Sequence, residues 1–229
     1  MVKNKVRFFI VSLLFPVQLF CQRPSTGVWL TAQLPIQLNS KWQVHNDFTY
    51  RTLGYSTSSL QNLYRLGIRY TINKNWSTTL GGAFSFTRTS FNKENDEFAK
   101  EFRIWEELNY KNDLADKLHL QIRLRTEERS FSGTSSKDAY HTFRYRIKPQ
   151  LVQQINTKWA LLVSNEYMQQ LINSKWSFDQ NRFMVSGIYT VTAQTQLQAG
   201  YMWLQWPQQS VQHIITLSFQ QNISLHAKQ

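Results

Sequence analysis

The residues best suited to chemistry in this sequence are arginines and glutamates that recur at every second position within otherwise apolar segments. In 118–129, leucine and isoleucine occupy alternate positions from 118 to 124, and charged or polar residues occupy 119, 121, 123, 125, 127 and 129. A β-strand places two such sets on opposite faces. A planar guanidinium can bridge carboxylates on neighbouring strands or hold an anion in two-point contact. The spacing therefore predicts either a ladder of ion pairs or a surface that binds anions.

Basic residues outnumber acidic residues on this polar face when the same alternation is applied along the chain. The expected basic members are Arg103, Arg123, Arg125, Arg129, Arg144, Arg146 and Arg182, joined by Arg51, Arg65, Arg69 and Lys148. The expected acidic members are Glu101, Glu107, Glu127 and Glu166, joined by Asp47. An Arg–Glu ladder that fills a narrow lumen is one interpretation. The surplus of positive charge supports the other, in which the face attracts anionic solutes.

Motifs for catalysis and metal binding are not found in the sequence. Hydrolysis by a serine nucleophile needs a histidine within hydrogen-bond reach and an orienting Asn or Asp. The histidines are His45, His119, His141, His213 and His226, and they lie outside any local serine motif. A Gly-rich phosphate loop and a paired-histidine metal motif are also missing. We therefore expect no catalytic, metal or cofactor site, and a lipid-modifying barrel enzyme is the least favoured alternative.

Residues 1–21 resemble a secretory signal peptide. A basic head at 3–7 precedes an apolar run at 8–15, and Cys21 can serve as the small residue before the cleavage point. The run is too short for a membrane-spanning helix, which needs about 20 apolar residues. Lipid attachment at Cys21 is disfavoured because the preceding Phe20 is bulky. Since Cys21 is the single cysteine, cleavage after it would leave a chain without thiol or disulfide chemistry.

Period-2 alternation continues through the rest of the chain, in about eleven segments separated by turn residues. Most of them reach the length of about 9 to 11 residues that a tilted transmembrane strand needs. Charged residues make up only 17% of the chain, which is low for a soluble domain. The segments are 27–38, 42–51, 60–71, 76–87, 100–111, 118–129, 140–153, 159–168, 179–191, 196–206 and 212–219.

These features predict an all-β protein, an antiparallel up-and-down transmembrane β-barrel over 22–220, with a C-terminal tail at 221–229. Because bacterial barrels of this class have an even number of strands, we expect about 12 strands, with about 10 as the alternative. Periodicity alone does not separate inside from outside, so a soluble lipocalin-like barrel or a sandwich stays an alternative. Strand length, aromatic residues at strand ends and the closing segment 213–219 favour the membrane.

A short motif, a polar turn followed by tryptophan, repeats along the chain. The copies lie at 39–42, 73–76, 156–159 and 173–176. Tryptophan settles at the boundary of water and lipid, where its ring is buried and its N–H stays hydrated. We expect Trp42, Trp76 and Trp159 to form an interface belt at the periplasmic end of the barrel, where turns are short. The fourth copy is expected in a longer loop at the opposite end.

Glu106 conflicts with this pattern, since it shares a strand face with Phe102, Ile104 and Leu108. A charge at mid-depth in lipid costs a few kcal/mol. A bulge near Trp105 that turns Glu106 inward would remove the conflict, and so would a position near the interface. The sequence leaves both options open.

The chain resembles family 2490 of the domains of unknown function, outer-membrane barrels of Gram-negative bacteria, over nearly all of its length. The residues that carry the resemblance are Gly27-Val28-Trp29, Glu101-Phe102-Arg103, Trp105-Glu106-Glu107-Leu108, 123–129, Phe143-Arg144-Tyr145-Arg146, Asn165-Glu166-Tyr167, Asn181-Arg182-Phe183, Gly187, Gly200-Tyr201-Met202 and the segment beginning at His213. The resemblance implies a barrel fold and an outer-membrane location. It implies no activity, because the family has none assigned.

Strand number bears on transport, since about 8 strands give a lumen filled by side chains and 16 to 18 leave an open channel. Our leading hypothesis is a narrow, anion-preferring pore for small solutes in the outer membrane of a Gram-negative bacterium. The alternative is a closed structural or adhesin-type barrel with an Arg–Glu-filled lumen. The expected partners are outer-membrane lipids, the barrel-insertion machinery during biogenesis and small anionic solutes. Nucleic acid is not an expected partner of an exported barrel.

Overall fold

The computed structural model describes residues 25–52, 54–55, 58–89, 97–135 and 137–225 of the chain, and nearly all of its regular structure is β. The strands are β1 (Ser25–Gln33), β2 (Ile36–Gln37), β3 (Trp42–Thr52), β4 (Ser59–Thr71), β5 (Trp76–Arg88), β6 (Phe98–Ala115), β7 (Leu118–Phe131), β8 (Tyr140–Gln154), β9 (Trp159–Ile172), β10 (Lys175–Thr190), β11 (Thr195–Gln205), β12 (Val211–Gln221) and β13 (Ile223–Ser224). A 3₁₀ turn, η1 (Pro207–Gln209), precedes β12. Within these ranges we find no helix long and apolar enough to cross a bilayer. The expected signal peptide lies outside the described residues.

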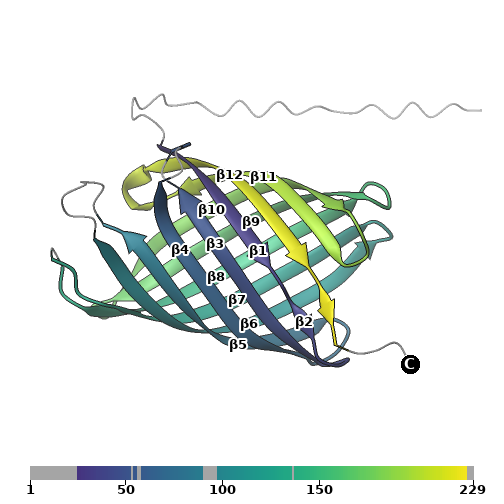
Figure 1. Ribbon diagram of the computed structural model, residues 1–229, viewed down its shortest axis with the longest axis horizontal. Coiled ribbons are helices and arrows are strands. Elements are labelled where there is room, and N and C mark those ends of the chain that lie inside the picture. The colour runs from purple at the N-terminus through teal and green to yellow at the C-terminus, as the bar shows by residue number, and fades with distance from the viewer. Residues whose placement is uncertain (1–24, 53, 56–57, 90–96, 136, 226–229) are drawn as a thin grey trace, which may run out of the picture.

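The strands form one sheet that closes into a barrel (Figure 1). Consecutive strands from β3 to β12 pair antiparallel, and β1 closes the wall between β12 and β3. β2 continues β1 and pairs with β3 and β13, while β13 continues β12. The wall built from the described residues therefore has 11 strands, and each segment expected from the sequence is one of them.

From the sequence we expected about 12 strands, or about 10, all paired antiparallel. The pair of strands that closes the barrel contradicts this expectation. β1 and β12 run parallel, in register from Ser25↔Gln212 to Gln33↔Gln220. A parallel pair satisfies the same backbone donors and acceptors with slanted hydrogen bonds. A barrel with an odd number of strands can therefore still close. As a consequence, the start of β1 and the end of β12 lie at opposite ends of the barrel (Figure 1).

Burial alternates along the strands with the apolar side chains outside. On β6, Glu101, Arg103 and Glu107 are buried, whereas Phe102 and Ile104 are 40% and 49% exposed. A soluble barrel would bury its apolar face, so this arrangement excludes the soluble alternative. An apolar outer wall around a polar interior is the design of a transmembrane barrel, in which closure leaves no unpaired strand edge in lipid.

Glu106 stays on the outer face. It pairs in unbroken register with Leu80 on β5 and Thr126 on β7, and its side chain is exposed. The bulge considered near Trp105 is therefore not present. The polar neighbours Thr126, Tyr145 and Gln169 line the same external hollow as Glu106, so the carboxylate has a locally polar surrounding.

The tryptophan turns at one end of the barrel share one hydrogen-bond pattern. The Oδ1 atoms of Asn39, Asn73 and Asn156 each accept the backbone N–H groups two and three residues ahead, at 2.9 to 3.0 Å. Each following tryptophan then packs on a tyrosine of the neighbouring strand. The pairs are Trp42–Tyr70, Trp76–Tyr110 and Trp159–Tyr189, with ring centroids 4.7, 4.8 and 4.8 Å apart. The repeat thus builds an aromatic girdle at this end, which we call the turn end.

The fourth copy of the motif lies at the other end, which we call the loop end, but not in a long loop. β9 and β10 are joined directly by Asn173 and Ser174, whose φ angles are 49° and 61°. Two consecutive residues with positive φ make the tight hairpin turn that matches strand twist. The expectation of a longer loop here was wrong, because both strands extend further than their alternation indicated.

A first prediction concerns the orientation of the wall. A spin label attached at Leu124→Cys should be relaxed strongly by a lipid-soluble paramagnet, because Leu124 is 45% exposed on the outer face. The same label at Gln121→Cys should respond to a water-soluble paramagnet, because Gln121 lines an internal cavity. The measurement is the power saturation of both labels in lipid vesicles. Exchanged responses of the two positions would contradict the inside-out arrangement.

Candidate functional site

The predicted arginines and glutamates lie together inside the barrel. The alternation of β6 to β10 points them inward, and their side chains are buried or half-buried. The residues placed there are Arg103, Arg123, Arg125, Arg129, Arg144, Arg146, Arg182, Glu101, Glu107, Glu127 and Glu166. Arg51, Arg65, Arg69, Lys148 and Asp47 also face the interior. The alternation of the strands thus brings these charged side chains together in the interior.

Glu127 is the centre of the ion-pair network. It is 1% exposed, and Arg146 donates to its Oε1 at 2.5 Å. Arg144 donates to the other oxygen through Nε at 2.9 Å and also through Nη2. Arg103 and Arg125 lie at 3.9 and 3.8 Å from the same carboxylate. Four arginines from three strands thus surround one negative charge.

Glu166 on β9 is the second centre. Arg123 donates to Oε1 at 2.5 Å, and Arg146 contacts the same oxygen through Nε at 2.9 Å and Nη2 at 2.7 Å. Arg182 lies further away, with Nη1 3.6 Å from Oε2. Because Arg146 bridges Glu127 and Glu166, the two centres form one connected network.

Further pairs extend the network toward both ends of the barrel. Glu101 accepts from Arg103 at 2.6 Å and from Arg129 at 2.5 Å at the loop end. Glu107 accepts from Arg125 toward the turn end, with Arg123 and Arg69 at 3.7 and 3.8 Å. Arg65 pairs with Asp47 at 2.8 Å on the adjoining wall. These contacts fix most guanidiniums in place.

Asp179 is an interior carboxylate that sequence reasoning missed. Alternation from Arg182 places it on the outer face, yet it is buried and accepts from Arg144 at 3.0 Å. The cause is a register shift between Phe178 and Gln180, which lets Asp179 and Gln180 both point inward. Such a bulge inserts one residue without disturbing the residue types on either side, so periodicity did not reveal it.

Trp105 is the largest fully buried side chain and lies in the lumen against β4 and β5. Its Nε1 donates to the carbonyl of Gly82 at 3.2 Å, and the Arg125 guanidinium lies over its ring at 4.4 Å. A Cβ on Gly81 would stand 2.5 Å from the indole, so only glycine leaves room for it. The indole therefore narrows the lumen from one wall and provides an aromatic face for a cation.

Three internal cavities follow one another along the lumen. Their volumes are about 430 Å³ at the loop end, 210 Å³ in the middle and 270 Å³ at the turn end. Arg51, Arg65, Arg146 and Arg182 line both the loop-end and the middle cavity. Arg65 also lines the turn-end cavity. Neighbouring cavities are therefore separated by little more than arginine side chains.

Positive charge dominates the walls of all three cavities. Eight Arg or Lys side chains and two carboxylates line the loop-end cavity. The corresponding numbers are six and one for the middle cavity. They are five and two for the turn-end cavity. Cations therefore outnumber carboxylates along the lumen from one end to the other.

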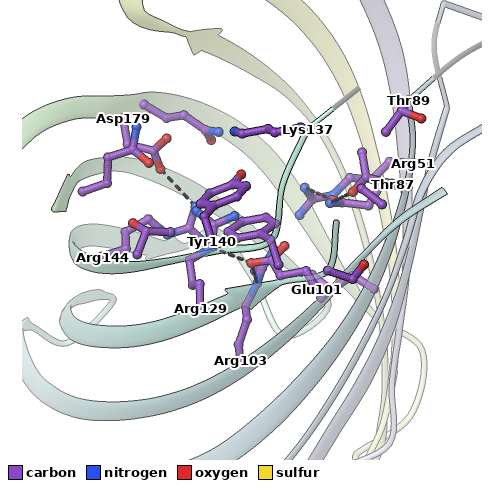
Figure 2. A pocket seen from close by; sticks show the side chains of 18 of the residues that line it. Arg51, Thr87, Thr89, Glu101, Arg103, Arg129, Lys137, Tyr140, Arg144 and Asp179 are labelled. Atoms are coloured by element: carbon purple, nitrogen blue, oxygen red, sulfur yellow. Dashed lines mark hydrogen bonds and ion pairs between the residues drawn. The ribbon is translucent and has the colours of Figure 1, made fainter. Parts of the chain in front are cut away.

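The loop-end cavity opens beneath the loop between β7 and β8. Figure 2 shows Arg103 and Arg129 converging on Glu101, Arg144 directed at Asp179, and Arg51 on the facing wall. Lys137 Nζ lies 3.7 Å from the centre of the Tyr140 ring at the rim.

A hydrogen-bonded contact ties this loop to the start of β6. Ser135 donates its backbone N–H and its hydroxyl to Glu97 at 2.8 and 2.7 Å. These hydrogen bonds favour the charged carboxylate and hold the pKa of Glu97 below its ordinary value. The contact holds one side of the rim in position.

Histidine contacts give no support to the enzyme alternative. Ser130 Oγ and His141 Nδ1 lie 3.0 Å apart on the exposed face of β7 and β8, a pairing that the sequence did not reveal. Among the described residues, His141 has no hydrogen bond to an Asn, Asp or Glu that would orient it for general-base catalysis. The described residues also contain no cluster of His, Cys, Asp or Glu that could hold a metal ion.

The closed wall, apolar outer surface, aromatic girdle and polar lumen define a transmembrane β-barrel of the outer-membrane class. Residues 26–213 match the model of a family described as "Protein of unknown function (DUF2490)". The chain belongs to this family, as its sequence resemblance implied. No curated protein matches the chain.

Several solved structures are similar to this chain at low sequence identity. One is described as the NanC porin, with 14% identity, a TM-score of 0.47, and coverage of 79% of this chain and 81% of that chain. Another is a loop-deletion mutant of OmpT, an outer-membrane protein of Vibrio cholerae, with 13% identity, a TM-score of 0.46, and coverage of 76% and 57%. A third is the β-domain of the Bordetella autotransporter BrkA, with 12% identity, a TM-score of 0.46, and coverage of 79% and 82%.

A second prediction concerns the centre of the network. Glu127→Gln should lower the free energy of unfolding by about 3 kcal/mol, because removing one partner leaves buried charge uncompensated. Glu128→Gln is the matched control, since the next side chain along β7 is exposed on the outer face and makes no ion pair among the described residues. Urea unfolding in lipid vesicles, followed by tryptophan fluorescence, measures both. Equal effects of the two variants would contradict a stabilising role for Glu127.

Proposed function

We propose that the protein is a narrow pore of the outer membrane that prefers small anions. The observation that carries the proposal is the series of three cavities, each with more cations than carboxylates in its wall. The barrel has 11 strands, which is more than the about 8 that give a filled lumen and fewer than the 16 to 18 that leave an open channel. Side chains thus narrow the path without filling all of it.

The narrowest parts of the path are expected where Arg51, Arg65, Arg146 and Arg182 separate the loop-end and middle cavities. Three of them are held by carboxylates, so their positions are fixed: Arg65 by Asp47, and Arg146 and Arg182 by Glu166. In an interior with an effective dielectric near 20, unit charges 4 Å apart interact by roughly 4 kcal/mol. A fraction of this energy suffices to favour anions over cations.

The second candidate function is a closed structural or adhesin-type barrel. It is favoured by the burial of the Glu127 and Glu166 centres, since Arg144, Arg146 and Glu127 are each at most 6% exposed. Ion pairs so shielded from solvent would stiffen the wall and block passage. The two candidates differ in one measurable property, the conductance of the folded barrel.

Orientation and export belong to the same proposal. Residues 1–21 would act as a cleaved secretion signal, and the barrel-insertion machinery would place the barrel among outer-membrane lipids. The turn end, with the belt of Trp42, Trp76 and Trp159, would face the periplasm, because short turns lie on that side in barrels of this class. The loop end would then face the exterior.

A third prediction tests this location. The processed protein should fractionate with outer membranes and migrate faster on a gel before boiling than after it, because an intact barrel is more compact than the unfolded chain. Mass spectrometry of the purified protein should find Gln22 at its N-terminus. Recovery from the soluble periplasm, without a shift on boiling, would contradict the proposed location.

A fourth prediction tests conduction. The purified barrel in a planar bilayer should conduct weakly with a reversal potential that indicates anion preference. Raising salt from 0.1 M to 1 M should weaken the preference, since the Debye length falls from about 10 Å to about 3 Å. Arg51→Glu should reduce or reverse it. Arg51 makes no ion pair with a carboxylate among the described residues, so its replacement leaves no carboxylate unpaired.

Lys158→Glu is the matched control, because it makes the same charge change in an exposed turn outside the lumen. It should leave the ion preference unchanged. Absence of conductance in a barrel shown to be folded would favour the closed structural barrel instead. Cation preference would contradict the assignment of the arginine face to the conducting path.

A further inference from the structure

The middle cavity has the highest ratio of cations to carboxylates of the three, six to one. Its cations are Arg51, Arg65, Arg123, Arg146, Lys148 and Arg182, and its single carboxylate is Glu166. That carboxylate is already shared by Arg123, Arg146 and Arg182. Arg65 and Arg146 also pair with Asp47 and Glu127 outside this wall, so the charge that no carboxylate compensates lies on the remaining cations.

Two of the cations have no carboxylate partner of their own. Arg51 donates from Nη1 to Gln61 at 2.6 Å, while its Nε is buried and has no hydrogen-bond partner. Lys148 lines the cavity and forms neither a hydrogen bond nor an ion pair with any described residue. A buried donor without a partner is costly, which applies to Arg51 Nε, and Lys148 is a half-buried charge without a protein partner, so an anion would stabilise each of them.

An indole in the same wall contacts two of the guanidiniums. The Arg51 guanidinium is 3.7 Å from the centre of the Trp29 ring, and the Arg182 guanidinium is 4.9 Å from it. Arg182 is held from its other side by Gln180 at 2.6 and 3.1 Å. Cation–π contacts restrict both guanidiniums, so the donors are already in position before a ligand arrives.

We infer that the middle cavity is a binding site for a small oxyanion, a carboxylate or phosphate group held by Arg51, Lys148 and Arg182. This inference deepens the proposed function, because it assigns a substrate class to the same lumen. Guanidinium forks and an ammonium group are the donors that recognise such groups. The cavity volume of about 210 Å³ is below the range of pockets for drug-sized ligands, so the solute is small.

The location of the site between two larger cavities has a consequence for transport. An anion that enters from either end would exchange the partial hydration of the outer cavities for direct contact with these donors. The site would then be occupied repeatedly during passage, and transport of the anion would saturate. Binding at equilibrium, however, does not require that the anion leave on the far side.

The test is isothermal titration calorimetry of the folded full barrel in detergent micelles, with sodium phosphate and sodium acetate as separate probes at constant ionic strength. We expect at least one of the two anions to bind. Lys148→Gln and Arg51→Gln should each weaken binding by roughly tenfold, because each removes a charged donor. Lys158→Gln is the matched control and should bind as the parent chain does. The fluorescence of the barrel should also respond to the bound anion, since Trp29 borders the site.

Lys148→Gln removes no ion pair, so it should fold even if Arg51→Gln does not. The change in gel mobility on boiling shows whether each variant has folded. Tighter binding of phosphate or of acetate identifies which oxyanion the site prefers. Failure of the folded parent barrel to bind either anion would overturn the inference. The conductance measurement would still decide whether the barrel is a pore. Binding that is equally strong in Lys148→Gln and Arg51→Gln, or equally weakened in Lys158→Gln, would also overturn it.

Discussion

The structure depends on one constraint, that the backbone hydrogen bonds of the wall be completed within the wall. In lipid, an unpaired strand edge would leave a row of donors and acceptors without water. The chain satisfies this constraint with a parallel seam between β1 and β12. Pro35, which lacks an N–H group, lies between the end of β1 and the start of β2. Closure separates a lipid-facing surface from an enclosed lumen and thereby determines which residues meet in the interior.

Enclosure changes the energetics of the charges inside. An exposed Arg–Glu pair contributes little to stability. The two charges of a buried pair interact strongly, and removing either one is strongly destabilising. The Glu127 and Glu166 centres meet this condition with several guanidiniums around each carboxylate. The same enclosure means that the surplus arginines and Lys148 produce a positive field throughout the lumen. The stability of the wall and the positive field of the lumen therefore both depend on the enclosure of these charges.

The carboxylates and the surplus cations divide these tasks in space. Arginines that pair with Glu101, Glu107 and Glu127 lie along β6 to β8, where the network is densest. Arg51 lies across the lumen on β3 and is free of carboxylates. The ion-pair ladder thus follows one wall, and the donors without a carboxylate lie on both sides of the lumen, because Lys148 is on β8.

The sequence by itself determined the strand segments, the division of each into an apolar and a polar face, and the Asn–Trp turns, because these follow from the two-residue period of a strand and from local hydrogen bonds. Tertiary structure decided the odd strand number, since parity depends on how the first and last strands meet. It also decided the inward position of Asp179, which depends on a bulge in the register of β9 and β10. The pairing of each arginine, and the lack of a carboxylate beside Arg51, were likewise set by the relative positions of strands distant in sequence. Such positions depend on the register and shear of the closed wall, which alternation along one strand does not encode.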